Sequence, residues 1–276
     1  MSKVTDVHLE LTNHCNLACP VCPNRVMKRP KAFMPFSMVK HIIEANPAVR
    51  QVGLSVWGEP LLHPKFLSIV EYLCGKGLEV GFSTNATLLT EDLSWNLVKV
   101  GLHDINFSVD ALGSEFERLR ECSFELVKDN ILYFLRLAVD VDITITVVAG
   151  SENESSIGET VDFWRQHAKV NVQPKVLFTR DKRVGKCYEL YRNHLVVLSN
   201  GNIVPCCVDY EGFCILGHAS TETLDECYNG EGMKLIREHG SCICDFCSEY
   251  ETSKAKTRFK HYTLLQRIHV LTEAFQ

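Results

Sequence analysis

The sequence predicts an α/β fold: a partial (β/α)6 barrel in residues 1–180, a small cysteine-rich domain in 181–253 and a helical tail in 254–276. Short runs rich in Val, Ile and Phe alternate with helix-like segments through the first two thirds of the chain, and the pattern then changes to a hairpin and clustered cysteines. The 276 residues, of which 46% are apolar, suffice for one large domain with a small appendage.

The predicted strands are six runs with the length and composition of buried strands: 7–11, 52–56, 79–83, 105–109, 143–148 and 170–176. The predicted helices between them span 37–44, 65–76, 90–100, 124–139 and 156–167. Ser37 and Thr90 are the expected caps of two of these helices. Strands separated by single helices pair in parallel through right-handed crossovers, which favours an open barrel.

The pattern changes after residue 178. Residues 179–186, TRDKRVGK, have the composition of a polar linker. The stretch 194–207 predicts a β-hairpin that turns at Asn200 and Gly201. Short helices are expected at 223–229 and 232–239, before the cysteines at 242–247, and the basic tail has helical periodicity.

Composition excludes several classes of protein. The net charge of −5 argues against a nucleic-acid binder that works by bulk electrostatics. No stretch approaches the roughly 18 apolar residues of a membrane span, and the N-terminus lacks the apolar core of a signal peptide. We therefore expect a cytoplasmic protein, where disulfides are rare, and metal binding is the leading explanation for its thirteen cysteines.

Three thiols, Cys15, Cys19 and Cys22, follow the first predicted strand, where parallel barrels carry their chemistry. A cubane [4Fe–4S] cluster takes one cysteine per iron, so three cysteines leave one iron open. The spacing C-x3-C-x2-C resembles the signature of the radical S-adenosylmethionine (SAM) superfamily. That resemblance implies that SAM chelates the open iron and that its reductive cleavage yields a 5′-deoxyadenosyl radical. The alternative is a zinc knuckle or a set of buried thiols.

The stretch WGEP, residues 57–60, follows the second predicted strand and resembles the Gly-Gly-Glu-Pro motif of the same family. The resemblance implies that Gly58 and Glu59 receive the amino group of SAM. Trp57 departs from the family pattern because it replaces the first glycine. A second departure is Val21, since many relatives have an aromatic residue before the third cysteine.

Polar residues at the ends of the next two strands are the remaining candidates for SAM binding. By resemblance, Ser83 and Asn85 end the third strand, and Ser108 and Asp110 end the fourth, at positions that contact the ribose and methionine parts of SAM. Arg120 is the candidate partner of the SAM carboxylate. The alternatives are a helix cap for each Ser or Asn and a surface salt bridge for Arg120.

A second set of cysteines has the order C-x13-G-x4-C, then C-x2-C much later. This order resembles the shortened twitch form of the SPASM domain, in which four cysteines hold one auxiliary [4Fe–4S] cluster. The cysteines implied as ligands are Cys187, Cys206, Cys244 and Cys247. Gly201 permits the tight turn of the hairpin. A zinc site of the same four thiols is the alternative, and Cys242 competes with Cys244.

The six other cysteines are Cys74, Cys122, Cys207, Cys214, Cys227 and Cys242. Most are expected to be buried as small apolar residues. Cys207 and Cys214 lie in the appendage, on the expected substrate side, and either is a candidate hydrogen-atom donor.

Three reactions remain open from the sequence. Alcohol oxidation, with the auxiliary cluster as electron acceptor, resembles aminocyclitol dehydrogenases. Hydrogen return from a cysteine resembles sugar and peptide epimerases, and peptide modification is the third possibility. The first strand begins near the N-terminus, which favours a small sugar- or cyclitol-like substrate over a peptide. The base that a dehydrogenase needs is unassigned; the candidates are Arg165, Arg180, Lys182, Arg183 and His194.

Two basic stretches, 25–31 and 254–260, are expected to be solvated faces, or alternatively anion sites. The first is also a candidate docking site for a flavodoxin- or ferredoxin-type electron donor. The non-enzyme hypothesis is a zinc-stapled α/β scaffold that binds a partner.

Overall fold

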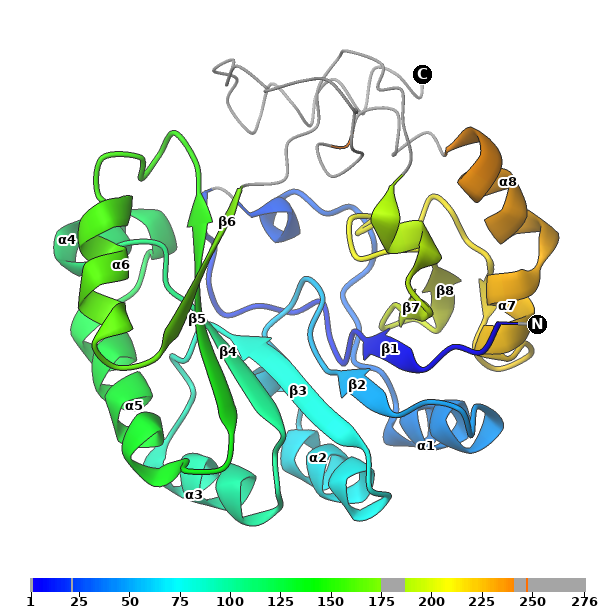
Figure 1. The fold of residues 1–276 in the computed structure, drawn as a ribbon, viewed down its shortest axis with the longest axis horizontal. Coiled ribbons are helices and arrows are strands. Elements are labelled where there is room, and N and C mark those ends of the chain that lie inside the picture. Colours follow the sequence, from blue (N-terminus) through cyan, green and yellow to red (C-terminus); the bar gives the residue numbers. More distant parts are fainter. Residues whose placement is uncertain (1, 21, 175–186, 241–246, 248–276) are drawn as a thin grey trace.

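The computed structural model describes residues 2–20, 22–174, 187–240 and 247, and in this part the chain forms one nine-stranded sheet (Figure 1). The order of the strands is β6-β5-β4-β3-β2-β1-β7-β8-β9. The strands are β1 Asp6–Leu9, β2 Gln51–Gly53, β3 Glu79–Thr84, β4 Asp104–Ser108, β5 Asp142–Ala149, β6 Lys169–Pro174, β7 His194–Val197, β8 Asn202–Val204 and β9 Gly217–His218.

The first six strands are parallel and confirm the predicted barrel strands. β2 is shorter than predicted, because the chain leaves the ladder after Gly53 and runs into the loop that carries Trp57. Successive side chains of a strand point to opposite faces of the sheet, so one face can be apolar and the other polar. Val7, Leu9, Val80 and Phe107 are buried in the apolar core under the helices, whereas their neighbours on the other face are mostly polar.

Helices cover the convex face of the sheet (Figure 1). They are α1 Phe36–Ala45, α2 Phe66–Gly75, α3 Glu91–Lys99, α4 Gly113–Arg120, α5 Phe124–Leu137 and α6 Ile157–Arg165, with α7 Leu224–Asn229 and α8 Glu231–His239 in the second part. Thr90 caps α3 as predicted, by accepting a hydrogen bond from the backbone N–H of Leu93. Ser37 was expected to cap α1, but it lies inside that helix, which begins after Pro35. The sequence did not predict α4.

The predicted hairpin is present and extends the barrel sheet. β7 and β8 are antiparallel and turn at Asn200–Gly201, where Gly201 has a φ of +90°. β7 also pairs in parallel with β1, with Asp6 opposite His194. The cysteine-rich part is therefore hydrogen-bonded directly to the first strand of the barrel, beside the three-cysteine loop.

Within the described ranges, no helix is long and apolar enough to cross a membrane. The predicted linker at 179–186 and the helical tail from residue 254 lie outside the described residues, as do Cys242 and Cys244 and the candidate bases Arg180, Lys182 and Arg183.

Candidate active site

The three-cysteine loop connects β1 to α1, at the C-terminal edge of the sheet. Cys19 is buried, and Cys15 and Cys22 are half-buried. Burial raises the pKa of all three thiols, and for Cys22 burial together with the neighbouring Cys19 and Cys15 thiols gives a value of about 11. The three thiols therefore lie close together in a site where thiolates need a bound metal group to stabilise them.

The donor set fits a cluster better than a single ion. The loop offers three thiols, whereas a structural zinc site takes four ligands. In a cubane cluster each cysteine binds a separate iron. Three soft thiolate donors with one open position match a cluster that keeps one iron free for SAM.

Gly58 lies directly on the three-cysteine loop. A Cβ atom at this position would lie 2.1 Å from the carbonyl oxygen of Thr12 and 2.7 Å from that of His14. The backbone N–H of Glu59 donates to the His14 carbonyl oxygen at 2.8 Å. The end of β2 and the cysteine loop thus pack backbone to backbone, and only glycine fits between them.

Glu59 is buried, with 2% of its surface exposed, and accepts three hydrogen bonds. One carboxylate oxygen accepts from the Leu61 N–H at 3.1 Å and the Thr84 hydroxyl at 2.9 Å, and the other accepts from the Asn85 N–H at 2.9 Å. Burial raises the pKa of Glu59 to about 6, although these hydrogen bonds oppose the increase. The carboxylate is held in one orientation with capacity for a further donor such as an ammonium group.

Asp110 and Arg120 form an ion pair with a distance of 2.6 Å between Oδ2 and an Nη atom. The alternative of a surface salt bridge for Arg120 is wrong, because its side chain is only 13% exposed and that of Asp110 only 6%. The other Asp110 oxygen accepts from the Val148 N–H at 2.9 Å. The Nε atom of Arg120 is buried and has no hydrogen-bond partner among the described residues, so the guanidinium retains a donor for an anionic ligand.

Asn85 and Ser83 lie at the end of β3 and face different neighbours. The Asn85 amide nitrogen donates to Asn16 Oδ1 at 3.0 Å, which connects it to the cysteine loop. The Ser83 hydroxyl accepts from the Asn106 amide at 3.0 Å. Ser108 ends β4 and is half-buried. Asn85 also accepts from the Thr87 N–H at 3.0 Å, in a turn of the loop after β3, whereas the cap of the next helix is Thr90.

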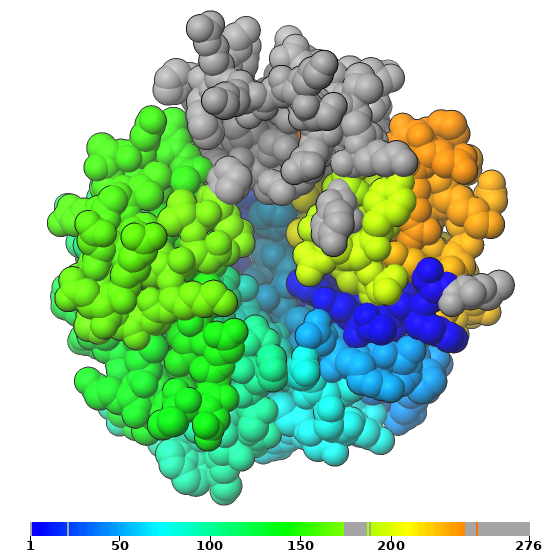
Figure 2. Space-filling view, viewed as in Figure 1, coloured from blue at the N-terminus to red at the C-terminus, as the bar shows by residue number. Residues whose placement is uncertain are grey.

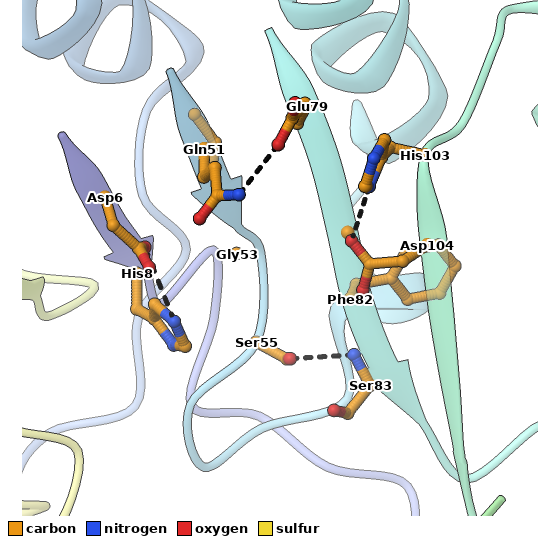
Figure 3. Close-up of a pocket in the computed structure, with 12 residues that line it drawn as sticks. Asp6, His8, Gln51, Gly53, Ser55, Glu79, Phe82, Ser83, His103 and Asp104 are labelled. Carbon is orange, nitrogen blue, oxygen red and sulfur yellow. Dashed lines mark hydrogen bonds and ion pairs between the residues drawn. The ribbon is translucent and has the colours of Figure 1, made fainter. Parts of the chain in front are cut away.

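A cavity of about 200 Å³ lies on the polar face of β1–β4 (Figure 3). It extends from the strand starts at Gln51 and Asp104 to Ser55 and Ser83 at the strand ends. Most of its lining residues are of polar type, and the full set consists of Asp6, His8, Gln51, Val52, Gly53, Ser55, Glu79, Gly81, Phe82, Ser83, His103 and Asp104. Glycine at position 81 makes room for the Asp104 carboxylate, which a Cβ atom there would approach to 2.0 Å.

The structure describes three of the four cysteines of the second set. Cys187 and Cys247 are buried, and Cys206 is half-buried. Cys206 packs with Cys247 and Val208 in a small apolar cluster of its own, whereas Cys187 belongs to the main core. Buried thiols of this kind suit an iron–sulfur cluster, and the fourth predicted ligand, Cys244, lies outside the described residues.

Of the two candidate hydrogen donors, Cys214 lies beside this second set and Cys207 is exposed. The buried carboxylate of Asp209 accepts from the N–H groups of Gly212, Phe213 and Cys214, at 3.0, 2.9 and 2.8 Å. These bonds fold the loop back, so that Cys214 packs in the cluster that contains Cys206 and Cys247.

The sequence did not indicate two residues that the structure places near the site. Cys122 is expected to be an ordinary core thiol. Burial, and after it the neighbouring Cys19 thiol, raise its pKa to about 11. Cys122 therefore lies near the first cysteine set. Its position two residues after Arg120 was the available signal. Thr84, which holds Glu59, follows Ser83 in the predicted strand and had no separate signal.

Comparison with protein families finds two matches. The model of the Radical SAM superfamily matches residues 9–163, and that of the SPASM iron–sulfur cluster-binding domain matches residues 187–249. The two ranges correspond to the barrel and to the cysteine-rich part.

Among characterised proteins, the chain is 31% identical over 109 residues to the tungsten-containing aldehyde ferredoxin oxidoreductase cofactor-modifying protein of Pyrococcus furiosus. That match covers 38% of this chain and 31% of the relative. The chain is also 30% identical over 173 residues to a probable GTP 3′,8-cyclase of Methanothermobacter marburgensis, which covers 60% of this chain and 56% of the relative. The matched region thus spans about a third to about half the length of these relatives.

Solved structures share the fold. BtrN, in a complex with AdoMet and 2-DOIA, aligns with a TM-score of 0.62 and 20% identity over 96% of this chain and 100% of its own. The anSMEcpe protein, with bound AdoMet and the Cp18Cys peptide, aligns with a TM-score of 0.70 and 14% identity over 98% of this chain and 96% of its own. SuiB of Streptococcus suis, bound to its precursor peptide SuiA, aligns with a TM-score of 0.69 and 16% identity over 90% of this chain and 70% of its own.

Proposed function

Because the chain belongs to the radical SAM superfamily and carries a SPASM domain, we propose that it oxidises an alcohol of a small sugar- or cyclitol-like substrate. Its cofactors are SAM, a SAM-binding [4Fe–4S] cluster and an auxiliary iron–sulfur cluster in the SPASM domain. When bound, the SAM-ligated cluster supplies a 5′-deoxyadenosyl radical that removes a hydrogen atom from carbon. The cluster ligands in this proposal are Cys15, Cys19 and Cys22.

The chain's own residues bind and orient SAM. The buried Glu59 carboxylate, fixed by three donors, receives the SAM amino group beside Gly58. Arg120, with its free Nε donor, receives the carboxylate while Asp110 holds its other side. Ser83, Asn85 and Ser108 at the adjoining strand ends take the ribose and the rest of the methionine part.

The cavity on the polar face of β1–β4 is the observation that supports a small, hydroxylated substrate. The carboxylate, imidazole, amide and hydroxyl groups that line it suit a substrate with many hydrogen-bonding groups. Hydrogen bonds from Ser55, in the loop after β2, through Ser83 and Asn106 to Thr146 continue the polar surface over β3, β4 and β5. A hydroxylated ring satisfies such a surface, whereas an apolar substrate leaves its polar groups unpaired.

In the proposed oxidation, the substrate loses a hydrogen atom from its carbinol carbon. The 5′-deoxyadenosyl radical takes up this atom and becomes 5′-deoxyadenosine. The hydroxyl proton would leave to a base, and an auxiliary cluster, when bound, would accept the remaining electron, so that the carbinol becomes a ketone. The auxiliary site proposed for this step consists of Cys187, Cys206, Cys244 and Cys247. Of the candidate bases, His194 and Arg165 lie in the described part, and neither lines the cavity.

The electron that cleaves SAM comes in this proposal from a flavodoxin- or ferredoxin-type donor. Arg25, Lys28 and Lys31 are exposed beside the three-cysteine loop and offer positive charge to such an acidic partner. Arg29, the fourth residue of that basic stretch, is buried and takes no part in docking.

The test is an anaerobic assay of the reconstituted protein with SAM, a reductant and a panel of sugars and aminocyclitols. We expect ketone and 5′-deoxyadenosine in a ratio of about one, and transfer of deuterium from a labelled carbinol carbon into 5′-deoxyadenosine. Replacement of Cys206 by Ala should abolish the ketone, whereas the matched change Cys74→Ala on α2 should not. A product that gains deuterium from solvent without oxidation contradicts the proposal and indicates epimerisation, with Cys214 as the first donor to replace.

Peptide modification is the second candidate. Its support is the fold similarity to anSMEcpe, solved with a bound peptide, which extends over 98% of this chain. Cleavage of SAM that depends on a peptide, with no response to the panel of small alcohols, would favour it.

A further inference from the structure

Trp57 lies where three parts of the molecule meet. It directly precedes Gly58 and Glu59 in the loop after β2. Its indole Nε1–H donates a hydrogen bond of 2.5 Å to the carbonyl oxygen of Cys207, in the segment after β8. Its ring packs edge-on against Tyr210 of the same segment, with 5.7 Å between ring centroids. The side chain thus connects the predicted SAM-binding loop to the cysteine-rich part.

The backbone of Trp57 contacts the first cysteine loop. Its carbonyl oxygen accepts a hydrogen bond from the side-chain amide of Asn24. Asn24 is the second residue after Cys22 in the same loop. A continuous path of hydrogen bonds and covalent bonds therefore runs from Cys22 through Asn24 and Trp57 to Cys207, the residue after Cys206.

The replacement of glycine by tryptophan explains why this path exists. A glycine in the same place has the same backbone carbonyl for Asn24 but no side chain. The indole supplies both a ring for Tyr210 and an N–H for the Cys207 carbonyl. The departure from the family motif thus adds a contact with the cysteine-rich part while Gly58 and Glu59 keep their places.

We propose that Trp57 is a positioning residue that couples SAM binding at Gly58 and Glu59 to the auxiliary-cluster segment at Cys206 and Cys207. The inference rests on the proposed function, which places SAM and the auxiliary cluster at these residues. SAM fixes the loop after β2, and the indole transmits that position to the Cys207 carbonyl. Coupling of this kind is reciprocal: loss of the auxiliary site changes SAM affinity through the same residue.

A second connection keeps the segment folded when the indole contact is removed. The Arg29 guanidinium donates to the Tyr210 carbonyl oxygen at 3.0 Å, and the Glu211 carboxylate accepts from the N–H groups of Lys28 and Arg29 at 2.8 and 2.9 Å. None of these bonds involves Trp57. The change Trp57→Phe therefore removes one donor, keeps a ring against Tyr210 and leaves this second connection intact.

The first experiment compares the auxiliary cluster with and without SAM. The signal of the auxiliary cluster is identified by EPR in the Cys15→Ala, Cys19→Ala, Cys22→Ala variant, and its midpoint potential is then measured in otherwise wild-type protein and in Trp57→Phe. We expect SAM to shift the potential in the wild type and not in Trp57→Phe, at unchanged iron content. The matched control is Trp95→Phe, an exposed indole on α3 that contacts Lys99, and it should retain the shift.

The second experiment is a double-mutant cycle on SAM affinity with Cys206→Ala and Trp57→Phe. Loss of the auxiliary site should weaken SAM binding by about fivefold in the wild-type background, the effect of about one hydrogen bond, and should have no effect when residue 57 is Phe. Additive losses overturn the inference.

Different results would contradict the role of Trp57 and the proposed function. If the wild type holds two clusters and SAM shifts the auxiliary potential equally in wild type and Trp57→Phe, the inference is wrong and the proposed function stands. If the wild type holds no second cluster, both are wrong.

Discussion

The guanidinium of Arg29 lies 2.8 Å from the carboxylate of Glu10, and both side chains are almost fully buried, with 5% and 0% of their surface exposed. The Oε2 atom of Glu10 also accepts from the Ser199 N–H at 2.9 Å, and Arg29 donates to the Ser199 hydroxyl at 3.1 Å. The ion pair thus joins β1 and the loop after the three cysteines to the end of the β7 strand. The expectation of a solvated basic face is wrong for Arg29.

Removal of Arg29 should destabilise the folded chain strongly. Arg29→Met leaves the Glu10 carboxylate buried without its charge partner, and we expect the free energy of unfolding to fall by about 3–5 kcal/mol. Urea denaturation of the anaerobic protein measures the change. The control Lys28→Met removes an exposed charge next to it and should change the free energy by less than about 0.5 kcal/mol. Equal midpoints for the two variants would show that the buried pair is not an important contact.

Arg120 should determine SAM affinity. Arg120→Met removes the buried guanidinium that the account assigns to the SAM carboxylate, and loss of such a charge-assisted contact corresponds to about 2–5 kcal/mol, so binding should weaken by about thirtyfold or more. Equilibrium dialysis with SAM measures it on reconstituted protein. Arg118→Met removes an exposed arginine of the same helix and should bind SAM normally. If both variants bind SAM like the wild type, Arg120 is a structural partner of Asp110 alone.

Gly58 should not tolerate a side chain. In Gly58→Ala the new Cβ atom meets the Thr12 and His14 carbonyl oxygens, which are backbone atoms and cannot rotate away. The end of β2 and the cysteine loop must separate, and we expect SAM affinity to fall by at least about tenfold. Gly75→Ala is the matched control, because a Cβ atom there meets nothing within 4 Å and alanine favours the helix. Normal SAM binding by Gly58→Ala would refute the close packing described here.

His194 should make stability depend on pH. Burial lowers its pKa, and the neighbouring His8 lowers it further, against Glu189 and Asp6, which raise it. Below about pH 6.5 the unfolded chain therefore binds a proton that the folded chain resists, so this contribution to stability is complete above that pH and is lost as the pH falls. Denaturation midpoints between about pH 7 and pH 5 should fall less steeply in His194→Phe than in the wild type. The exposed His41→Phe should keep the wild-type slope, and an unchanged slope in His194→Phe would contradict the assignment.

Much of the barrel was predictable because its signals are local. Runs such as 143–148 are apolar enough to be strands in any context, and β5 forms there. Thr90, followed by two acidic residues, is a helix start that needs no tertiary information. The position of Glu59 beside the cysteine loop followed from the WGEP motif, which is also local in sequence.

The remaining features depend on contacts between distant residues. Helix α4 is short and polar, and it was missed because only Phe116 and Leu119 of its residues are buried. The parallel pairing of β7 with β1 joins residues almost 190 positions apart, and no local pattern encodes it. Arg29 looks like its exposed neighbours in the sequence, and only the fold reveals that Glu10 lies opposite it.

The most direct test of the account is the amount of iron and acid-labile sulfide per chain after anaerobic reconstitution. The wild type should hold about eight irons, and the Cys15→Ala, Cys19→Ala, Cys22→Ala variant about four, because one cluster of two is removed. Replacement of Cys206 and Cys247 by Ala should leave the other four. A wild type with about four irons that all disappear with the first three cysteines would contradict the auxiliary site and the oxidation proposed for it.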